Sequence, residues 1–287
     1  MPQPWIVTDA SVRFPSKDFL SRYPVTILPT TLRRGTDSLE DGPSVDLTAA
    51  MPLFEWDVRP ATWEAASVES IVATYERLHK ETNRIISIHT SSSLNGTVAN
   101  ARIAMQQFLG RCNIQVIDSM SFSAGLGMLV QYAAIGAERG AELEEIVRIV
   151  RGLIPRLYSV FFLDDMTYLE RNRLVSRSQA ILGNMLGVIP FVTMEEGQVV
   201  PMEKVQSRAR AIEKLVEFVS EFASVDHIAI LQNTSTPGEE TEGVLERVRS
   251  VHPHAPIHVI GYGPSVATLV GLNSLGMVVL ESEEDLQ

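Results

Sequence analysis

One stretch of the sequence, residues 85–100, constrains the fold more than any other. It reads IISIHTSSSLNGTVAN. Its isoleucines, Ile85, Ile86 and Ile88, form a short β-branched run that favours a buried strand. Small polar residues follow, and helical character begins at Val98. A strand, a polar turn and a helix in this order are typical of an α/β sheet, which presents its ligand site at the carboxyl ends of the strands.

The polar turn between this strand and helix has two interpretations. Hydroxyl groups, an amide and the free N–H groups of a helix start would together suit a polar or anionic head group. The same composition is also typical of an ordinary Ser/Thr-rich loop that caps a helix. The stretch by itself leaves both interpretations open.

Length, charge and cysteine content narrow the class of protein. The chain has 287 residues and a hydrophobic fraction of 45%, which allow two domains and a substantial core. Its formal net charge of −11 argues against a nucleic-acid partner, because phosphate binding needs a basic face. The apolar runs are too short to span a bilayer, and the first residues lack the pattern of a signal peptide. A single cysteine, Cys112, favours a reducing compartment, so we expect a cytoplasmic protein.

The order of predicted elements indicates an α/β fold with two domains. Alternating strands and helices in the first half predict a largely parallel sheet with helices on both faces. Pro155 breaks an amphipathic helix, and the pattern changes after it. We therefore expect an N-terminal domain over residues 1–155 and a C-terminal domain over residues 156–287. The second domain is predicted to hold a mixed sheet with helices on one face.

Three local predictions are specific enough to be checked. Residues 25–32 read as one strand interrupted by Pro29. Thr62 is expected to cap a helix that runs to about Lys80. Glu195, Glu196 and Gly197 separate two strands and predict a hairpin turn.

Metal and nucleophile chemistry find little support in the sequence. His252, His254 and His258 are spaced like metal ligands, but no cysteine or carboxylate accompanies them, so we expect no metal site. His89 precedes the serines of the polar turn. Neighbouring residues on a strand face opposite sides, however, which disfavours a Ser–His pair there.

Two carboxylates, Asp9 and Asp118, stand at the ends of predicted strands. Both could face the crevice beside the polar turn, or both could serve as helix N-caps. The sequence favours the caps.

Several segments in order along nearly the whole chain resemble the DegV family, the fatty-acid-binding proteins of bacteria. Single motifs are weak, but their order and spacing are specific. The segments are IVTD at residues 6–9, VDLT at 45–48, HTSSSLNGT at 89–97, VIDSMSFSAGLG at 116–127, YLERNRLVSRSQAIL at 168–182, and the stretches 183–190 and 271–280.

This resemblance implies a two-domain α/β protein with a long apolar tunnel between the domains that holds one fatty acyl chain. It also implies that the head group lies near the serine-rich turn. In the family the protein is not itself the catalyst but presents the acid to a separate fatty acid kinase related to dihydroxyacetone kinases. Burial of a sixteen-carbon chain is worth roughly 11 kcal/mol gross, at about 0.8 kcal/mol per methylene. That suffices to draw an acid from a membrane, so transient membrane contact is expected.

The resemblance also assigns head-group positions, and here the sequence departs from the family. The family's carboxylate-binding Thr aligns with Asp57, and its carboxylate-binding Ser aligns with Asn95. Ser93 and Thr97 belong to the same turn. The Arg before the lipid-lining helix is kept as Arg173.

Asp57 is the most consequential change, because an ionised carboxylate repels another. Two like charges about 4 Å apart cost roughly 4 kcal/mol at an effective dielectric constant near 20. Asp57 could be protonated, the alignment could be shifted so that Thr62 supplies the hydroxyl, or the ligand's head group could be something other than an anion.

The leading hypothesis is therefore a carrier of a long-chain fatty acid or a related acyl lipid, with no other cofactor. Two alternatives stay open. One is an enzyme that acts on an acyl substrate through Asp57, since a carboxylate can serve as a general base. The other is an interaction protein whose tunnel is filled by its own side chains.

Overall fold

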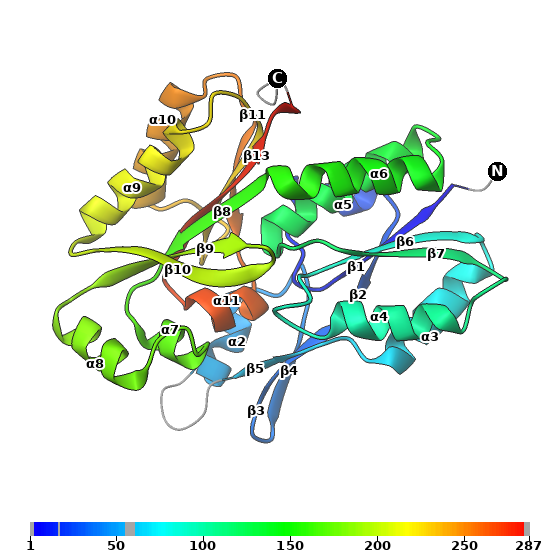
Figure 1. The fold of residues 1–287 in the computed structure, drawn as a ribbon, viewed down its shortest axis with the longest axis horizontal. Helices are drawn as coiled ribbons and strands as arrows, with labels where there is room; N and C mark the ends of the chain where they lie inside the picture. The colour runs from blue at the N-terminus through cyan, green and yellow to red at the C-terminus, as the bar shows by residue number, and fades with distance from the viewer. Residues whose placement is uncertain (1–2, 17, 55–60, 284–287) are drawn as a thin grey trace.

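The computed structural model describes residues 3–16, 18–54 and 61–283. Three β-sheets organise them, and helices pack between and around the sheets (Figure 1). The sheets are named here the parallel sheet, the small sheet and the mixed sheet. The predicted α/β class is confirmed.

The parallel sheet has the strand order β2-β1-β6-β7, and all of its neighbours run parallel. Its strands are β1 (Trp5–Asp9), β2 (Val25–Leu28), β6 (Arg84–His89) and β7 (Asn113–Asp118). Helices α3 (Val68–His79) and α4 (Thr97–Gln106) cover one face. Helices α5 (Ser123–Glu138) and α6 (Leu143–Leu153) cover the other (Figure 1). The prediction of helices on both faces is confirmed.

The small sheet is antiparallel, with the order β4-β3-β5, and the sequence did not predict it. Its strands are β3 (Thr30–Arg34), β4 (Asp37–Asp41) and β5 (Thr62–Glu64). The single strand predicted over residues 25–32 is in fact two, because Pro29 cannot donate to a ladder and the chain leaves one sheet for another there. Strands β3 and β4 form a hairpin.

The prediction that Thr62 caps a helix is wrong. Thr62 lies in β5, where its neighbour Trp63 pairs with the buried Leu32 of β3. The helix starts later, after Ser67, whose Oγ accepts a hydrogen bond from the backbone N–H of Ser70 at 3.2 Å. Both residues are good caps, and pairing with β3 decides between them because it is a contact that local sequence does not reveal.

The mixed sheet has the order β10-β9-β8-β13-β11-β12, and only β11 and β12 run parallel. Its strands are β8 (Leu157–Phe162), β9 (Ile189–Glu195), β10 (Gln198–Val205), β11 (Val225–Gln232), β12 (Ile257–Gly261) and β13 (Leu275–Glu281). Helices α9 (Arg208–Ser220) and α10 (Glu239–Val251) cover one face, as predicted (Figure 1). The predicted hairpin turn joins β9 to β10.

Shorter helices complete the described chain. They are α1 (Phe19–Arg22), α2 (Leu47–Phe54), the 3₁₀ turn η1 (Ile154–Arg156), α7 (Thr167–Arg171), α8 (Arg177–Met185) and α11 (Pro264–Val270). The sequence did not predict α11. No helix in the described ranges is long and apolar enough to cross a membrane.

The largest core cluster lies between the parallel and mixed sheets. It joins Ile6 and Ile88 of the parallel sheet, residues of α5 and α6, and Phe161 and Val278 of the mixed sheet. Two smaller clusters lie beneath α3 and α4 and beneath α9 and α10. All strands of the mixed sheet follow residue 156. Because one core cluster joins both sheets, the two-domain division at residue 155 stays a prediction.

Candidate functional site

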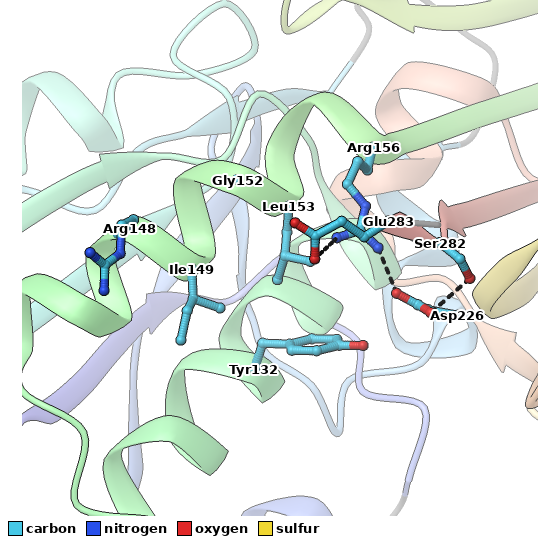
Figure 2. Close-up of a pocket in the computed structure, with 9 residues that line it drawn as sticks. All are labelled: Tyr132, Arg148, Ile149, Gly152, Leu153, Arg156, Asp226, Ser282 and Glu283. Carbon is cyan, nitrogen blue, oxygen red and sulfur yellow. Dashed lines mark hydrogen bonds and ion pairs between the residues drawn. The ribbon is translucent and has the colours of Figure 1, made fainter. Parts of the chain in front are cut away.

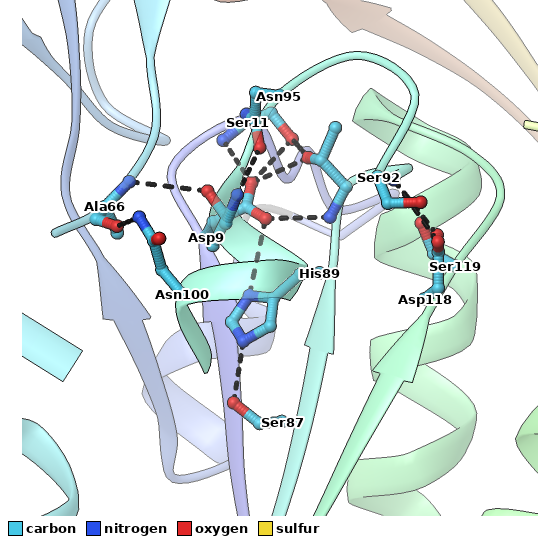
Figure 3. A network of polar contacts seen from close by, with 12 residues as sticks. Asp9, Ser11, Ala66, Ser87, His89, Ser92, Asn95, Asn100, Asp118 and Ser119 are labelled. Atoms are coloured by element: carbon cyan, nitrogen blue, oxygen red, sulfur yellow. Dashed lines mark hydrogen bonds and ion pairs between the residues drawn. The ribbon is translucent and has the colours of Figure 1, made fainter. Parts of the chain in front are cut away.

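The carboxyl ends of β1, β6 and β7 meet in a network of polar contacts (Figure 3). Asp9, at the end of β1, is its centre. Its Oδ2 accepts the Thr90 backbone N–H at 2.7 Å, and its Oδ1 accepts the Thr90 hydroxyl at 2.8 Å and the Ser11 hydroxyl at 2.9 Å. All three residues are buried. Asp9 thereby ties the loop after β1 to the start of the serine-rich turn.

A line of side chains continues from Asp9 beneath the sheet (Figure 3). His89 Nδ1 lies 3.4 Å from Asp9 Oδ2, and His89 Nε2 lies 2.7 Å from Ser87 Oγ. The Tyr75 hydroxyl donates to the same Oγ at 2.8 Å. The order Ser87–His89–Asp9 resembles a hydrolase triad. Ser87 is completely buried, however, so this hydroxyl cannot reach a substrate, and the line is structural.

The surroundings of Asp9 favour its ionised form. Burial opposes ionisation, but His89 and the two donors of Thr90 outweigh it and lower the pKa of Asp9. Asp9 therefore accepts hydrogen bonds from the Thr90 N–H and hydroxyl as an ionised carboxylate.

Asp118, at the end of β7, holds the next loop. Its Oδ1 accepts the backbone N–H of Met120 at 3.0 Å, and its two oxygens lie 3.3 Å from the N–H of Ser92. The preferred prediction that Asp9 and Asp118 cap helices is wrong, because both bind loop N–H groups. The carboxyl ends of adjacent parallel strands lie side by side. A side chain at the end of one strand therefore reaches the loop that follows its neighbour, which favours these contacts over helix caps.

The serine-rich turn also contacts the mixed sheet. The Ser91 hydroxyl donates to the carbonyl of Gly197, in the turn between β9 and β10, at 2.6 Å. Gly197 has a φ of +80°, and a Cβ there would lie 2.5 Å from Ser91 Oγ. The position therefore requires glycine, and the contact joins the two halves of the chain beside the polar turn.

Asn95, Ser93 and Thr97 lie together in this turn and at the start of α4. Asn95 Oδ1 accepts the backbone N–H of Thr97 at 2.9 Å. Asn95 Nδ2 is buried and has no hydrogen-bond partner among the described residues. Thr97 is buried, and its hydroxyl accepts the N–H of Ala66 at 3.3 Å. Ser93 is exposed.

Two further predicted site residues, Thr62 and Arg173, lie outside this turn. Thr62 is exposed, and its hydroxyl donates to the Arg33 carbonyl at 3.2 Å. Arg173 is exposed in the loop after α7 and has a left-handed backbone with φ of 60°. Asp57 lies outside the described residues.

Sequence reasoning missed a buried ion pair where several elements meet. Arg13 Nη2 lies 3.6 Å from Asp41 Oδ1, and Asp41 also accepts the N–H of Ser265 at 3.2 Å. Burial lowers the pKa of Arg13 and raises that of Asp41, despite their attraction. The pair links the loop after β1 to β4 and α11. The hydrogen bond between Ser265 and Asp41 spans 224 residues, so no local pattern could have revealed that these elements meet.

A separate pocket of about 800 Å³ opens between α6 and the end of β13 (Figure 2). Arg156 crosses it and donates to Asp226 at 2.6 Å and to the Glu281 carbonyl at 2.8 Å. Asp226 also accepts the Ser282 hydroxyl at 2.8 Å. The polar groups of this pocket are hydrogen-bonded to one another, and these bonds hold the end of β13 in place.

The histidine motif near β12 is dispersed. His252 is buried, and its Nε2 lies 2.9 Å from the Val219 carbonyl oxygen. His258 instead stacks on His227 at a ring-centroid distance of 6.5 Å. In the described part of the chain, no three His, Cys, Asp or Glu side chains group in a way that could hold a metal ion.

The fold and this turn define an α/β protein in which a parallel and a mixed sheet meet beside a polar, serine-rich loop. The sequence profile of the DegV family, described as an uncharacterised protein family, matches residues 5–282. A DegV domain-containing protein of Caldanaerobacter subterraneus is 34% identical over 214 residues, which are 75% of each chain. The chain therefore belongs to the DegV family.

Two solved structures share the fold. A fatty acid binding DegV family protein from Streptococcus agalactiae aligns with a TM-score of 0.85 and 19% identity, over 99% of this chain and 100% of that one. The Fatty Acid Kinase (Fak) B3 protein of Streptococcus pneumoniae, loaded with linoleic acid, aligns with a TM-score of 0.83 and 17% identity, over 97% and 100%.

Proposed function

We propose that this chain binds a long-chain fatty acid or a related acyl lipid in a tunnel between its two halves and presents the head group to a separate kinase. Family membership supports the ligand class, since both solved relatives named above carry or bind fatty acids. The name of the second of them and the family resemblance support the kinase partner.

The observation that carries the proposal is the free amide of Asn95. A buried N–H group without a partner costs about 1–3 kcal/mol, so native proteins rarely leave one. Asn95 Nδ2 is such a group, while Oδ1 of the same amide is held by the Thr97 N–H. The amide is therefore oriented with its donor end free, and a ligand oxygen would satisfy it.

The surroundings of Asn95 suit presentation of a head group. Ser92, Ser93 and Gly96 are exposed, whereas Thr97 and Val98 are buried. A head group bound to Asn95 would lie at the boundary between the core and solvent. A partner enzyme could reach it there without the acyl chain leaving its apolar surroundings.

The nature of the head group is a second part of the proposal. Asn95 can donate to a carboxylate, an alcohol, an amide or an ester alike. Asp57, where the family has a hydroxyl, disfavours a simple anion unless it is protonated. We therefore propose a divergent member whose ligand has a head group other than a plain carboxylate.

Helix α8 gives the protein a surface for contact with a membrane, from which an acyl lipid would be taken. Ile181, Leu182, Met185 and Leu186 are all exposed, and Met185 is 80% exposed. Arg177 is exposed at the start of the same helix. Exposed apolar side chains beside a cationic one are typical of segments that bind the bilayer surface.

Native mass spectrometry of the purified protein, followed by extraction and identification of the released molecule, tests the proposal. A bound acyl species is expected, and its head group decides the role of Asp57. Ordinary free fatty acids as the only ligands would leave the carrier function intact and overturn the divergent head group. An empty protein that takes up no added fatty acid or fatty alcohol would overturn the carrier function.

A further inference from the structure

A hollow of about 600 Å³ is lined by Gly197 and Met120, where the turn between β9 and β10 approaches the loop after β7. Its lining is mostly apolar. The lining residues are Met120, Ser121, Ile154, Pro155, Leu157, Tyr158, Ser159, Met194, Glu196 and Gly197.

One large apolar side chain of this hollow, Met120, is 42% exposed. Tyr158 also lines the hollow and is 39% exposed, and its ring packs on Phe222 at a centroid distance of 5.1 Å. Scattered single apolar residues are common on surfaces, but a concave group of them marks an interaction site more often. Met120 has a φ of 51°, in the left-handed region that residues with side chains seldom adopt. The Asp118 carboxylate holds it there by accepting its N–H.

The rim of the hollow is acidic. Glu195 and Glu196 are both exposed at the hairpin turn. A third carboxylate, Asp118, accepts the backbone N–H of Met120, which lines the hollow. In the described ranges neither glutamate has an ion-pair partner, and no lysine or arginine lines the hollow. An apolar floor with carboxylates at its edge is complementary to an apolar side chain flanked by cations.

The hollow also adjoins the serine-rich turn that carries the proposed head-group site. Gly197 lines it, and the Gly197 carbonyl accepts the Ser91 hydroxyl of the serine-rich turn. A Cβ at Gly197 would lie 2.9 Å from Met120 Sδ, so the two sides fit closely. A protein that acts on a head group at Asn95 would approach across this surface.

We propose that the hollow is the docking site for a segment of a partner protein that carries an apolar side chain next to arginine or lysine. This rests on the proposed function in one respect, because the partner we assign to it is the kinase that receives the ligand. A membrane is not the occupant, because the carboxylates at the rim repel anionic lipid head groups.

A titration that needs no kinase tests the docking chemistry directly. The chain has ten methionines, and Met120 and Met194 both line the hollow. Their isotope-labelled methyl signals are followed by NMR while a short peptide of alternating arginine and leucine is added. We expect these two signals to shift and saturate while those of distant methionines stay in place. The same peptide with glutamate for arginine should have no effect.

Charge reversal provides the matched comparison. The double variant Glu195→Lys with Glu196→Lys should abolish the shifts. The variant Glu76→Lys with Glu246→Lys, which reverses two exposed glutamates on α3 and α10, should keep them. Unchanged Met120 and Met194 signals, equal shifts of all methionines, or a response to anionic vesicles in place of the peptide would each overturn the docking site.

A kinase assay separates this proposal from the proposed function. With a fatty acid kinase of the dihydroxyacetone kinase class, the Glu195→Lys, Glu196→Lys variant should show at least a tenfold higher KM for the loaded protein. Its affinity for the acyl ligand should be unchanged. An unchanged KM with normal phosphorylation overturns the docking site and leaves the carrier function standing. A chain that binds no acyl lipid overturns the carrier function, and the peptide titration still decides the docking site.

Discussion

At the scale of single residues, the free amide of Asn95 is the group most open to test. Asn95→Ala removes the buried, unpartnered amide donor that we propose binds the ligand. Loss of a hydrogen bond to a charged oxygen costs about 1.5–3 kcal/mol, and to a neutral one about 0.5–1.5 kcal/mol. We expect at least tenfold weaker binding of an ionised acid and a smaller loss for a fatty alcohol, measured by displacement of a fluorescent acyl probe.

Ser92→Ala is the control for this measurement, because Ser92 is exposed in the same turn. Asn95→Ser, which introduces the residue of the family pattern, should restore binding of a free acid. Equal affinities for Asn95→Ala and the unaltered protein would show that the amide does not read the head group.

The lowered pKa of Asp9 makes the stability of the folded chain fall on acidification. Its pKa is lowered in the folded chain, so it is stabilising above its unfolded value of 3.8. This contribution is lost as the pH falls below 3.8 and through the folded pKa. Asp9→Asn should cost about 3 kcal/mol at neutral pH, as expected for breaking a buried pair. Urea unfolding of both proteins should show this difference shrinking below pH 3.8, and a difference that grows there would contradict the assignment.

At the scale of elements, the turn between β9 and β10 connects the two halves through one glycine. Gly197 and Gly35 both have positive φ, at +80° and +62°, but only at Gly197 would an added Cβ have neighbours within 4 Å. Alanine at either position incurs the left-handed penalty of about 1–2 kcal/mol. Gly197→Ala should lose at least about 1 kcal/mol more than Gly35→Ala in chemical unfolding, because its Cβ would meet Ser91 Oγ. Equal losses of unfolding free energy for the two variants would show that Ser91 moves aside at no cost.

We expect the exposed apolar side chains of α8 to bind the membrane surface. Leu182→Asp with Met185→Asp should reduce binding to anionic vesicles at least tenfold in a flotation assay, because each aspartate opposes insertion and the anionic surface. Ile103→Asp with Leu109→Asp is the matched control, since these residues are also exposed but belong to α4 and the loop after it. Equal binding by both double variants would exclude α8 as the membrane surface.

The elements also show where sequence reasoning stops. The strand over residues 84–89 and the helix from Thr97 follow from a β-branched run and a change of period. The strand β5 carries no such signal in three residues, and it is a strand only because it pairs with β3. For that reason the local sequence favours Thr62 as the cap, although the capping hydroxyl belongs to Ser67.

At the scale of the whole molecule, the shared core predicts that the two halves unfold together. Phe161, Val278 and Leu280 of the mixed sheet pack in one cluster with residues of α5 and the parallel sheet. Each such side chain loses about 1.5–3 kcal/mol of burial when the other half is removed. Calorimetry should show a single transition for the full chain, and a fragment of residues 156–287 should lack a cooperative one. Two separate transitions would establish independent domains.

The sequence by itself determined the α/β class, the order of most strands and helices, the hairpin after Glu195 and the place of the polar turn. These depend on periodicity, β-branching and turn residues within a few positions of one another. The tertiary structure alone decided the partners of Asp9, 81 residues from Thr90, and the contact of Ser91 with Gly197, 106 residues away. Such contacts depend on which strand ends become neighbours in a sheet, and strand order is a property of the packed core that no local window of sequence contains.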